Sequence, residues 1–399
     1  MLSTIKKLQA DILYSGVVYG TSGNNTPDAA AAITVCRKHG IRRIRILDTD
    51  ELAIQSLKSM GIEATVGVKD EDLPVLASSY EAVKSWFEAN LKPYVPFEFV
   101  VNYIVVGNQF IPGPNGKYVL PVVKNLQRVL ADNKLSQIKV ATLVSTAVLR
   151  AVFPPSKAAF SAKAEGDLIP LLQHLQATVT HTHRSYWNMF DALVDAFVWA
   201  MEKRELIVKM VIGETGWPST GNGQTTTPEL ARTYNQNFLR HITAGQSPIL
   251  IEVCPCYFFA DGLICQDFAT FSAHKAVYWD NGLGYWNMFD ALVDAFVWAM
   301  EKRELIVKMV IGETGWPSTG NGQTTTPELA RTYNQNFLRH ITAGQCTPKR
   351  PNTYGEGFVY SMFDENGKLE AGDQGVGIFD ANEKPVYHLY FLYPKSASN

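Results

Sequence analysis

One stretch of 61 residues occurs twice in this chain without a single difference, as Tyr186–Gln246 and as Tyr285–Gln345. Each copy contains the segment Gly-Glu-Thr-Gly-Trp-Pro-Ser, so one candidate active-site carboxylate is present twice, as Glu214 and Glu313. Repeat proteins stack at least three shorter units with atypical ends, whereas this is one long block copied once. The chain is therefore not a solenoid, and a single pocket can use only one of the two glutamates. A recent tandem duplication, a faulty gene prediction or an engineered insertion would each leave this pattern.

Short apolar runs that alternate with helical patterns predict an α/β protein. The run Val100–Val106 is almost continuously apolar, which is typical of a parallel strand buried on both faces. Once one copy of the duplicated block is left out, eight strands with intervening helices remain, and they predict a (β/α)8 TIM barrel. The expected strands are Gly16–Tyr19, Ile41–Leu47, Ile62–Val68, Phe97–Gly107, Ile138–Val144, Pro248–Val253, Val307–Ile311 and Gly357–Met362.

The second copy is the one that we expect to contribute its strand to the barrel. A strand precedes it and the final strand follows it, whereas removing 178–246 joins a predicted helix directly to the next strand. A closed barrel links strand number, tilt and shear, so a ninth strand is not a small change. We therefore expect residues 1–399 to form one barrel domain, with 178–246 as an inserted helix–strand–helix segment that duplicates 285–345.

Two Thr-Pro-acid segments predict helix starts, because each offers a capping hydroxyl, proline at the first helical position and an acid in the first turn. They begin at Thr26 and at Thr326. The segment that follows Trp286 has apolar residues at helical spacing, which predicts one buried face. Asp290 and Asp294 share a face of this helix, and we expect both carboxylates to be solvated.

Composition excludes several classes of function. The net charge of −2 gives no basic surface for nucleic acid, and no apolar run approaches the roughly 20 residues that span a bilayer. Five cysteines are too few for a disulfide scaffold, and Cys254-Pro-Cys256 lacks zinc-site spacing, so we expect these thiols in a core or pocket wall. His181 and His183 lack further ligands nearby. We expect no metal, no cofactor and a monomer, and no signal peptide is visible after Met1.

Candidate chemical groups follow three of the predicted strands, at the ends where barrel enzymes carry their active sites. The fourth strand ends at Asn108-Gln109, the seventh at Glu313 with Trp316 close behind, and the eighth at Phe363-Asp-Glu365. A lone glutamate would be interpreted as a solvated loop residue. A glutamate beside a tryptophan, facing an amide pair across the barrel, fits a sugar site better, because glycoside chemistry uses carboxylates.

These segments resemble glycoside hydrolase family 17, the plant-type glucan endo-1,3-β-glucosidases. The resemblance rests on Gly312-Glu-Thr-Gly-Trp-Pro-Ser318, Met362-Phe-Asp-Glu-Asn366 and Ile104-Val-Val-Gly-Asn-Gln109, in that order, and extends over nearly the whole chain outside 178–246. It implies a (β/α)8 barrel, a β-1,3-glucan substrate, and a retaining mechanism with an acid/base on strand four. Glu313 matches the nucleophile. Positions that contact substrate or support the nucleophile match Tyr19, Asn108, Trp316, Phe363 and Glu365. The family also implies a secreted or cell-wall location.

The sequence departs from the pattern of the family in three segments. Gln109 stands where the family has its general acid/base glutamate, and an amide has no proton of suitable acidity to give. Cys254-Pro-Cys256 stands where the family usually has Tyr-Pro-Tyr, and Leu47 where a tyrosine is common. Loss of general acid–base help typically slows a reaction by about 10²–10⁴-fold. We therefore expect impaired hydrolysis of β-1,3-glucan.

Alternatives remain open at this point. Glu252 stands on the sixth strand where the family tends to have asparagine, and strand alternation could point it inward as a replacement acid. Glu365 could serve likewise, although we expect it to support the nucleophile. A catalytically silent β-glucan-binding protein and a product without function are the rival interpretations of the chain as a whole.

Overall fold

The chain divides into two compact units, Met1–Ala177 with Ser247–Asn399, and Thr178–Gln246. The computed structural model describes residues 15–20, 24–57, 60–94, 100–177, 219–221, 226–227, 247–343, 347–351, 355–368 and 375–391. All helices and strands named below belong to the first unit. Glu214, His181 and His183 lie outside the described residues, as does Cys346.

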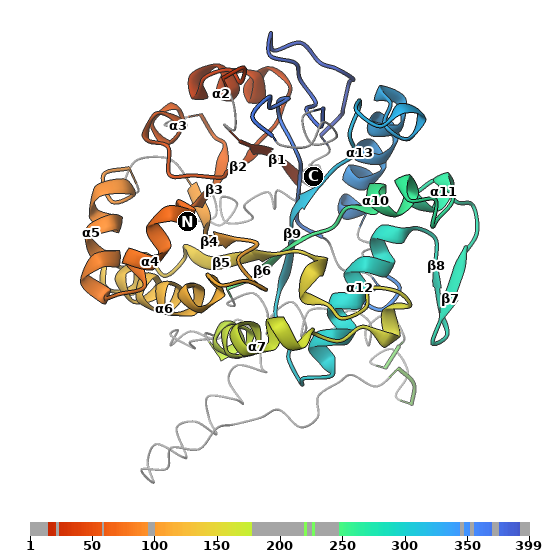
Figure 1. Cartoon of the computed structure of the whole chain (residues 1–399), viewed down its shortest axis with the longest axis horizontal. Helices are drawn as coiled ribbons and strands as arrows, with labels where there is room; N and C mark the ends of the chain where they lie inside the picture. Colours follow the sequence, from red (N-terminus) through yellow and green to blue (C-terminus); the bar gives the residue numbers. More distant parts are fainter. Residues whose placement is uncertain are drawn as a thin grey trace. The chain divides into compact units, whose positions relative to one another are not determined.

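Eight parallel strands close into a barrel, as predicted (Figure 1). Going round the barrel, the order is β1, β10, β9, β6, β5, β4, β3 and β2, and the second copy of the duplicated block supplies β9. The strand bounds are β1 Ser15–Tyr19, β2 Arg43–Ile46, β3 Glu63–Gly67, β4 Val100–Asn108, β5 Lys139–Val144, β6 Ile249–Glu252, β9 Met309–Thr314 and β10 Gly357–Val359.

Helices lie outside the strands and cover the barrel (Figure 1). A short antiparallel hairpin, β7 Tyr278–Asp280 with β8 Leu283–Tyr285, was not predicted. The α-helices are α2 Ala29–Lys38, α3 Glu51–Ser56, α4 Leu73–Leu76, α5 Tyr80–Asn90, α6 Gly116–Asp132, α7 Ala162–Ala177, α10 Pro255–Ala260, α11 Gln266–Ala269, α12 Met288–Glu301 and α13 Pro327–Thr342. Single 3₁₀ turns lie at Asp70–Asp72, Thr146–Val148, Pro155–Lys157 and Gly322–Thr324.

The core has an inner and an outer layer, which explains why the strands are apolar on both faces. Alternate strand residues fill the barrel interior, and their neighbours pack against the helices. In β6, Leu250 belongs to the inner layer and Ile251 to the outer one. The inner layer comprises Val18, Tyr103, Val105, Ala141, Leu143, Leu250, Val310 and Phe358.

A buried ionic cluster lies at the amino ends of the strands. Arg43 Nη2 and Lys308 Nζ contact the two oxygens of Glu356 at 2.9 and 2.5 Å. Burial opposes the ionisation of Glu356, but Arg43 and Lys308 outweigh it and lower the pKa of this carboxyl group to about 2. Residues at the amino ends of barrel strands contribute to stability, whereas active sites lie at the carboxyl ends. We therefore assign this cluster a structural role.

Two local predictions are wrong. Helix α2 is capped by Asp28, whose Oδ1 accepts the N–H of Ala31 at 2.8 Å, so it starts two residues later than the Thr26 prediction. Thr326 caps α13 as expected. Asp290 and Asp294 are 5% and 0% exposed, because their helix face packs against other elements: Asp290 contacts His340 of α13 at 2.7 Å.

Candidate active site

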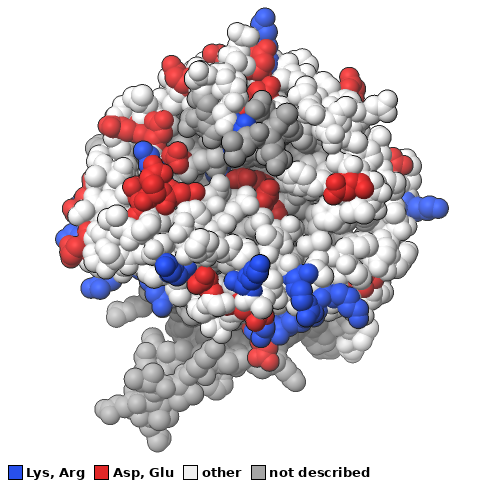
Figure 2. Space-filling view, in the orientation of Figure 1, with Lys and Arg blue, Asp and Glu red and all other residues white. Residues whose placement is uncertain are grey.

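A cavity of about 200 Å³ lies at the carboxyl ends of the strands. Figure 2 shows acidic side chains within a hollow of the face in view. The strands β4, β6 and β9 each send residues at or near their carboxyl ends to this cavity. Two of the three strand ends expected to carry chemical groups, the fourth and the seventh, therefore meet here, together with the end of the sixth strand. Its lining consists of Leu47, Asn108, Gln109, Glu252, Cys254, Cys256, Tyr257, Glu313, Gly315, Pro317, Tyr360, Lys368 and Val376.

The end of β4 is irregular, and this irregularity turns its amide residues into the cavity. The register with β5 shifts between Val105 and Asn108, and Gly107 and Gln109 both have positive φ, 78° and 61°. Asp70 Oδ1 accepts the N–H of Asn108 at 3.3 Å, which anchors the turn. A glutamine in this left-handed region is unusual. Gln109 is solvent-exposed in the mouth of the cavity, at the place where the resemblance expects the acid/base.

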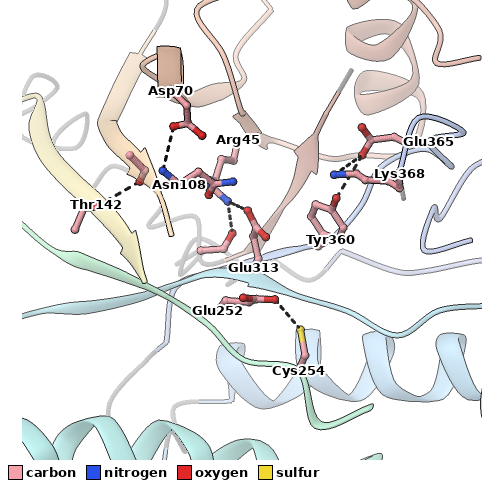
Figure 3. A network of polar contacts seen from close by, with 12 residues as sticks. Arg45, Asp70, Asn108, Thr142, Glu252, Cys254, Glu313, Tyr360, Glu365 and Lys368 are labelled. Atoms are coloured by element: carbon pink, nitrogen blue, oxygen red, sulfur yellow. Dashed lines mark hydrogen bonds and ion pairs between the residues drawn. The ribbon is translucent and has the colours of Figure 1, made fainter. Parts of the chain in front are cut away.

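Glu313 is held by Arg45, a residue to which the sequence analysis gave no role. Arg45 Nη1 donates to Glu313 Oε1 at 2.5 Å and to the carbonyl of Gly312 at 3.2 Å. Its Nη2 donates to Asn108 Oδ1 at 3.1 Å, so one guanidinium joins the ends of β4 and β9 (Figure 3). Both members of the ion pair are buried, with Arg45 2% and Glu313 7% exposed. The position of Arg45 inside β2, with apolar neighbours, was the signal in the sequence.

Trp316 does not offer a face for sugar stacking. It is 0% exposed, its Nε1 donates to the carbonyl of Thr324 at 2.9 Å, and its ring packs against Phe259 and Tyr333. Gly315 explains the close approach of this loop, since a Cβ there would lie 2.0 Å from the carbonyl oxygen of Tyr360. The Glu-Thr-Gly-Trp segment therefore anchors the loop after Glu313 in the core, and Trp316 supports this loop without presenting its ring to the cavity.

Tyr19, Phe363 and Glu365 also lie behind the cavity and are absent from its lining. The Tyr19 hydroxyl donates to the carbonyl of Pro27 at 3.0 Å, and its ring meets Phe363 edge-on at 6.3 Å. Glu365 is 1% exposed; its Oε1 accepts from the Tyr360 hydroxyl at 3.5 Å and lies 3.9 Å from Lys368 Nζ. These contacts give Glu365 a supporting place beneath two cavity-lining residues.

The β6 side of the cavity carries an acid and two thiols. Glu252 is half-buried, and the Cys254 thiol donates to its Oε1 at 3.6 Å (Figure 3). A hydrogen bond with Cys256, together with burial and the charge of Glu252, raises the pKa of the Cys254 thiol well above its usual range. Both cysteines line the cavity, as the pocket-wall prediction expected. The side chains of the two cysteines are smaller and less polar than the tyrosines that the family usually has at these positions.

Comparison with known proteins gives this geometry its family. The sequence profile described as "Glycosyl hydrolases family 17" matches residues 15–182, 173–247 and 245–391. The chain belongs to glycosyl hydrolases family 17. A probable glucan endo-1,3-beta-glucosidase of Arabidopsis thaliana is 36% identical over 380 residues, covering 94% of this chain and 90% of that protein.

Solved structures of family 17 relatives share the fold over their full length. A beta-1,3-glucanase and allergen of Cryptomeria japonica pollen superposes with a TM-score of 0.74 at 29% identity, covering 95% of this chain and 99% of that one. One of two plant beta-glucan endohydrolases with distinct substrate specificities gives 0.71 at 28% identity, covering 94% and 100%. The chain is thus a glycoside hydrolase by family.

No cluster of three or more metal-binding side chains occurs in the part of the chain that the structure describes. Within the same part, no helix is both long and apolar enough to cross a membrane.

Proposed function

We propose that the chain is an endo-acting β-1,3-glucanase that works with retention of configuration, with Glu313 as its nucleophile and a cell-wall glucan as its substrate. The observation that carries this proposal is the buried Glu313–Arg45 pair at the floor of a cavity that Asn108 and Gln109 line from the other side. The names of the relatives add the substrate class.

Arg45 prepares Glu313 for attack in two ways. Its guanidinium forms a buried ion pair with the carboxylate, and its hydrogen bond to Oε1 fixes the rotamer, which leaves Oε2 as the attacking atom. In a double displacement, Glu313 first forms an ester with the anomeric carbon, and water then hydrolyses that ester. Asn108 shares the guanidinium, so the β4 side of the cavity helps to hold the nucleophile in place.

The first step needs a proton for the leaving sugar oxygen, and Gln109 can donate a hydrogen bond but not that proton. We expect slow cleavage of laminarin by the chain as it stands. Gln109→Glu should raise the rate, because it restores a carboxyl group at the position where the family has its acid/base. Recovery should be incomplete because Leu47, Cys254 and Cys256 also line the cavity. A reducing-sugar assay on laminarin with both proteins tests this expectation.

The nucleophile is tested by trapping it with a 2-deoxy-2-fluoro-β-laminaribiosyl fluoride, whose fluoride leaves without a proton. Tryptic peptides cannot locate the label, because Met210–Arg232 and Met309–Arg331 have identical sequences. The matched variants Glu214→Gln and Glu313→Gln resolve this ambiguity. We expect one label per chain in the parent and in Glu214→Gln, and none in Glu313→Gln. Labelling that survives Glu313→Gln and is lost in Glu214→Gln would refute the assignment.

A catalytically silent β-glucan-binding protein is the second candidate, and the amide at Gln109 is the observation that favours it. Binding of laminarin to the parent without product release, together with unchanged behaviour in Gln109→Glu, would support that candidate over the glucanase.

A further inference from the structure

Glu252 is the second acidic side chain in the lining of the cavity, next to Glu313, among the residues that the structure describes. It is the last residue of β6, and β6 is the direct neighbour of β9 in the barrel. The pairing of the two strands shifts by one residue at their ends, so that Glu252 becomes the register partner of Glu313. This irregularity is what places both carboxyl groups in one cavity.

The relative position of the two glutamates is fixed by the backbone. Val253 N donates to the carbonyl of Glu313 at 3.0 Å, and Thr314 Oγ1 donates to the carbonyl of Val253 at 2.5 Å. Neighbouring strands lie about 4.7–4.9 Å apart, and the carboxyl groups of a retaining pair lie about 5–5.5 Å apart. The register pairing therefore places the two backbone positions at about the separation that a retaining pair needs, with both side chains in one cavity.

Other acids near the cavity are less suited to proton transfer. Glu365 is buried behind Tyr360 and Lys368 and is absent from the cavity lining. Asp70 accepts a backbone N–H that anchors the β4 turn, and it does not line the cavity either. Glu252 faces the cavity, and its Oε1 receives the Cys254 thiol, which orients the carboxyl group.

We propose that Glu252 has taken over the general acid/base role that Gln109 cannot perform. This inference rests on the proposed function, since it takes Glu313 as the nucleophile. Glu313 forms the ion pair with Arg45 and is assigned the attack on the anomeric carbon, and Glu252 is then the group that gives and takes the proton.

The reaction balances with these two groups and water. Glu313 Oε2 bonds to the anomeric carbon while the bond from that carbon to the glycosidic oxygen breaks. The Glu252 O–H gives its proton to the departing oxygen, which leaves as a sugar hydroxyl, and Glu252 becomes a carboxylate. Glu252 then takes a proton from water as the water oxygen attacks the anomeric carbon, and Glu313 leaves as a carboxylate.

The test compares the parent with Glu252→Gln, Glu252→Asp and Glu252→Gln/Gln109→Glu, using laminarin and 2,4-dinitrophenyl β-laminaribioside. The dinitrophenolate leaves without a proton, so its release reports glycosyl-enzyme formation alone. Glu88→Gln is the matched control, because Glu88 is an exposed residue of α5 whose contact is a surface pair with Lys92.

For Glu252→Gln we expect laminarin hydrolysis to fall by about 10²-fold or more. A burst of one equivalent of dinitrophenolate should remain, and azide should accelerate turnover and yield the β-glycosyl azide. Glu252→Asp should be intermediate, Glu88→Gln should match the parent, and Gln109→Glu should restore laminarin hydrolysis in the Glu252→Gln background.

Three results would overturn the inference. The first is that Glu252→Gln hydrolyses laminarin at the rate of the parent. The second is that the rates on laminarin and on the dinitrophenyl glycoside fall equally, without rescue by azide, in variants that still take the fluoride label. The third is that the parent does not hydrolyse laminarin. The last measurement needs no variant, so misfolding of Glu252→Gln leaves the inference refutable. If Glu313 takes the fluoride label while any of these results is seen, the Glu252 inference fails and the proposed nucleophile stands. Absence of the label refutes the proposed function instead.

Discussion

Replacing Arg45 by methionine should both destabilise the barrel and slow the reaction of Glu313 with substrate. Methionine fills a similar length of the barrel interior but leaves Glu313 without its buried counter-charge. Breaking a buried ion pair by removing one partner typically costs about 3–5 kcal/mol, because the remaining charge stays buried and uncompensated. For a chain of this length each kcal/mol lowers the melting midpoint by about 2 °C or less, so we expect a fall of up to roughly 10 °C.

A double-mutant cycle isolates the contribution of the ion pair. Glu313→Gln removes the charge that Arg45 balances, and Arg45→Met should therefore cost several kcal/mol less in that background than alone. Melting midpoints of the four proteins, recorded at one scan rate, give the coupling. Additive effects would show that Arg45 acts through packing and not through Glu313.

Arg45→Lys distinguishes charge from geometry at the same position. Lysine keeps the positive charge but cannot reach Glu313 and Asn108 at once with a planar fork. We expect a smaller loss of stability than for methionine, and slower trapping of Glu313 by the fluoride reagent. A trapping rate equal to that of the parent would refute a positioning role for the guanidinium.

Three further expectations concern stability and thiol chemistry. Burial raises the pKa of Asp294 to about 6 from 3.8, so the stability that its proton confers is complete below about pH 4 and is lost as pH rises through 6. At about 1.36 kcal/mol per pKa unit, this stability amounts to roughly 3 kcal/mol. Asp294→Asn should therefore make the melting midpoint less dependent on pH between pH 4.5 and 8, and an unchanged pH dependence would contradict the raised pKa. Deletion of 178–246 should leave a cooperative thermal transition at or above the parental midpoint, because the junction needs only a short connection; a lower midpoint would place that segment in the core. N-ethylmaleimide should label the exposed Cys265 before Cys254, whose raised pKa keeps it a thiol, as peptide mapping will show; faster labelling of Cys254 at pH 7 would contradict the raised pKa.

The barrel could be predicted because its signals are local and repeated. Each strand is a short apolar run, and the number of runs decides the architecture once the duplicated block is counted once.

Helix caps were less predictable. Thr26 and Thr326 are each followed by proline and an acidic residue, yet only Thr326 caps its helix, because Asp28, two residues after Thr26, accepts the N–H of Ala31 instead.

The burial of Asp290 and Asp294 and the contacts of Arg45 were missed for a common physical reason, which is contact with residues from other elements of the fold. Asp290 and Asp294 look like surface residues in their own helix, but His340, Tyr285 and the N–H of Lys349 come to them from elsewhere. Arg45 looks like an interruption in an apolar strand until β9 brings Glu313 to it.

The duplicated block repeats one glutamate of the candidate active site, as Glu313 and Glu214. The groups that position Glu313 come from β2, from β4 and from the residue after β6: Arg45 pairs with its carboxylate, Asn108 shares that guanidinium, and the N–H of Val253 donates to its carbonyl. All three residues lie outside both copies of the duplicated block, so the duplication repeats the carboxylate without repeating the residues that position it. Function in this chain is a property of the closed barrel, which has one place for a strand between β6 and β10.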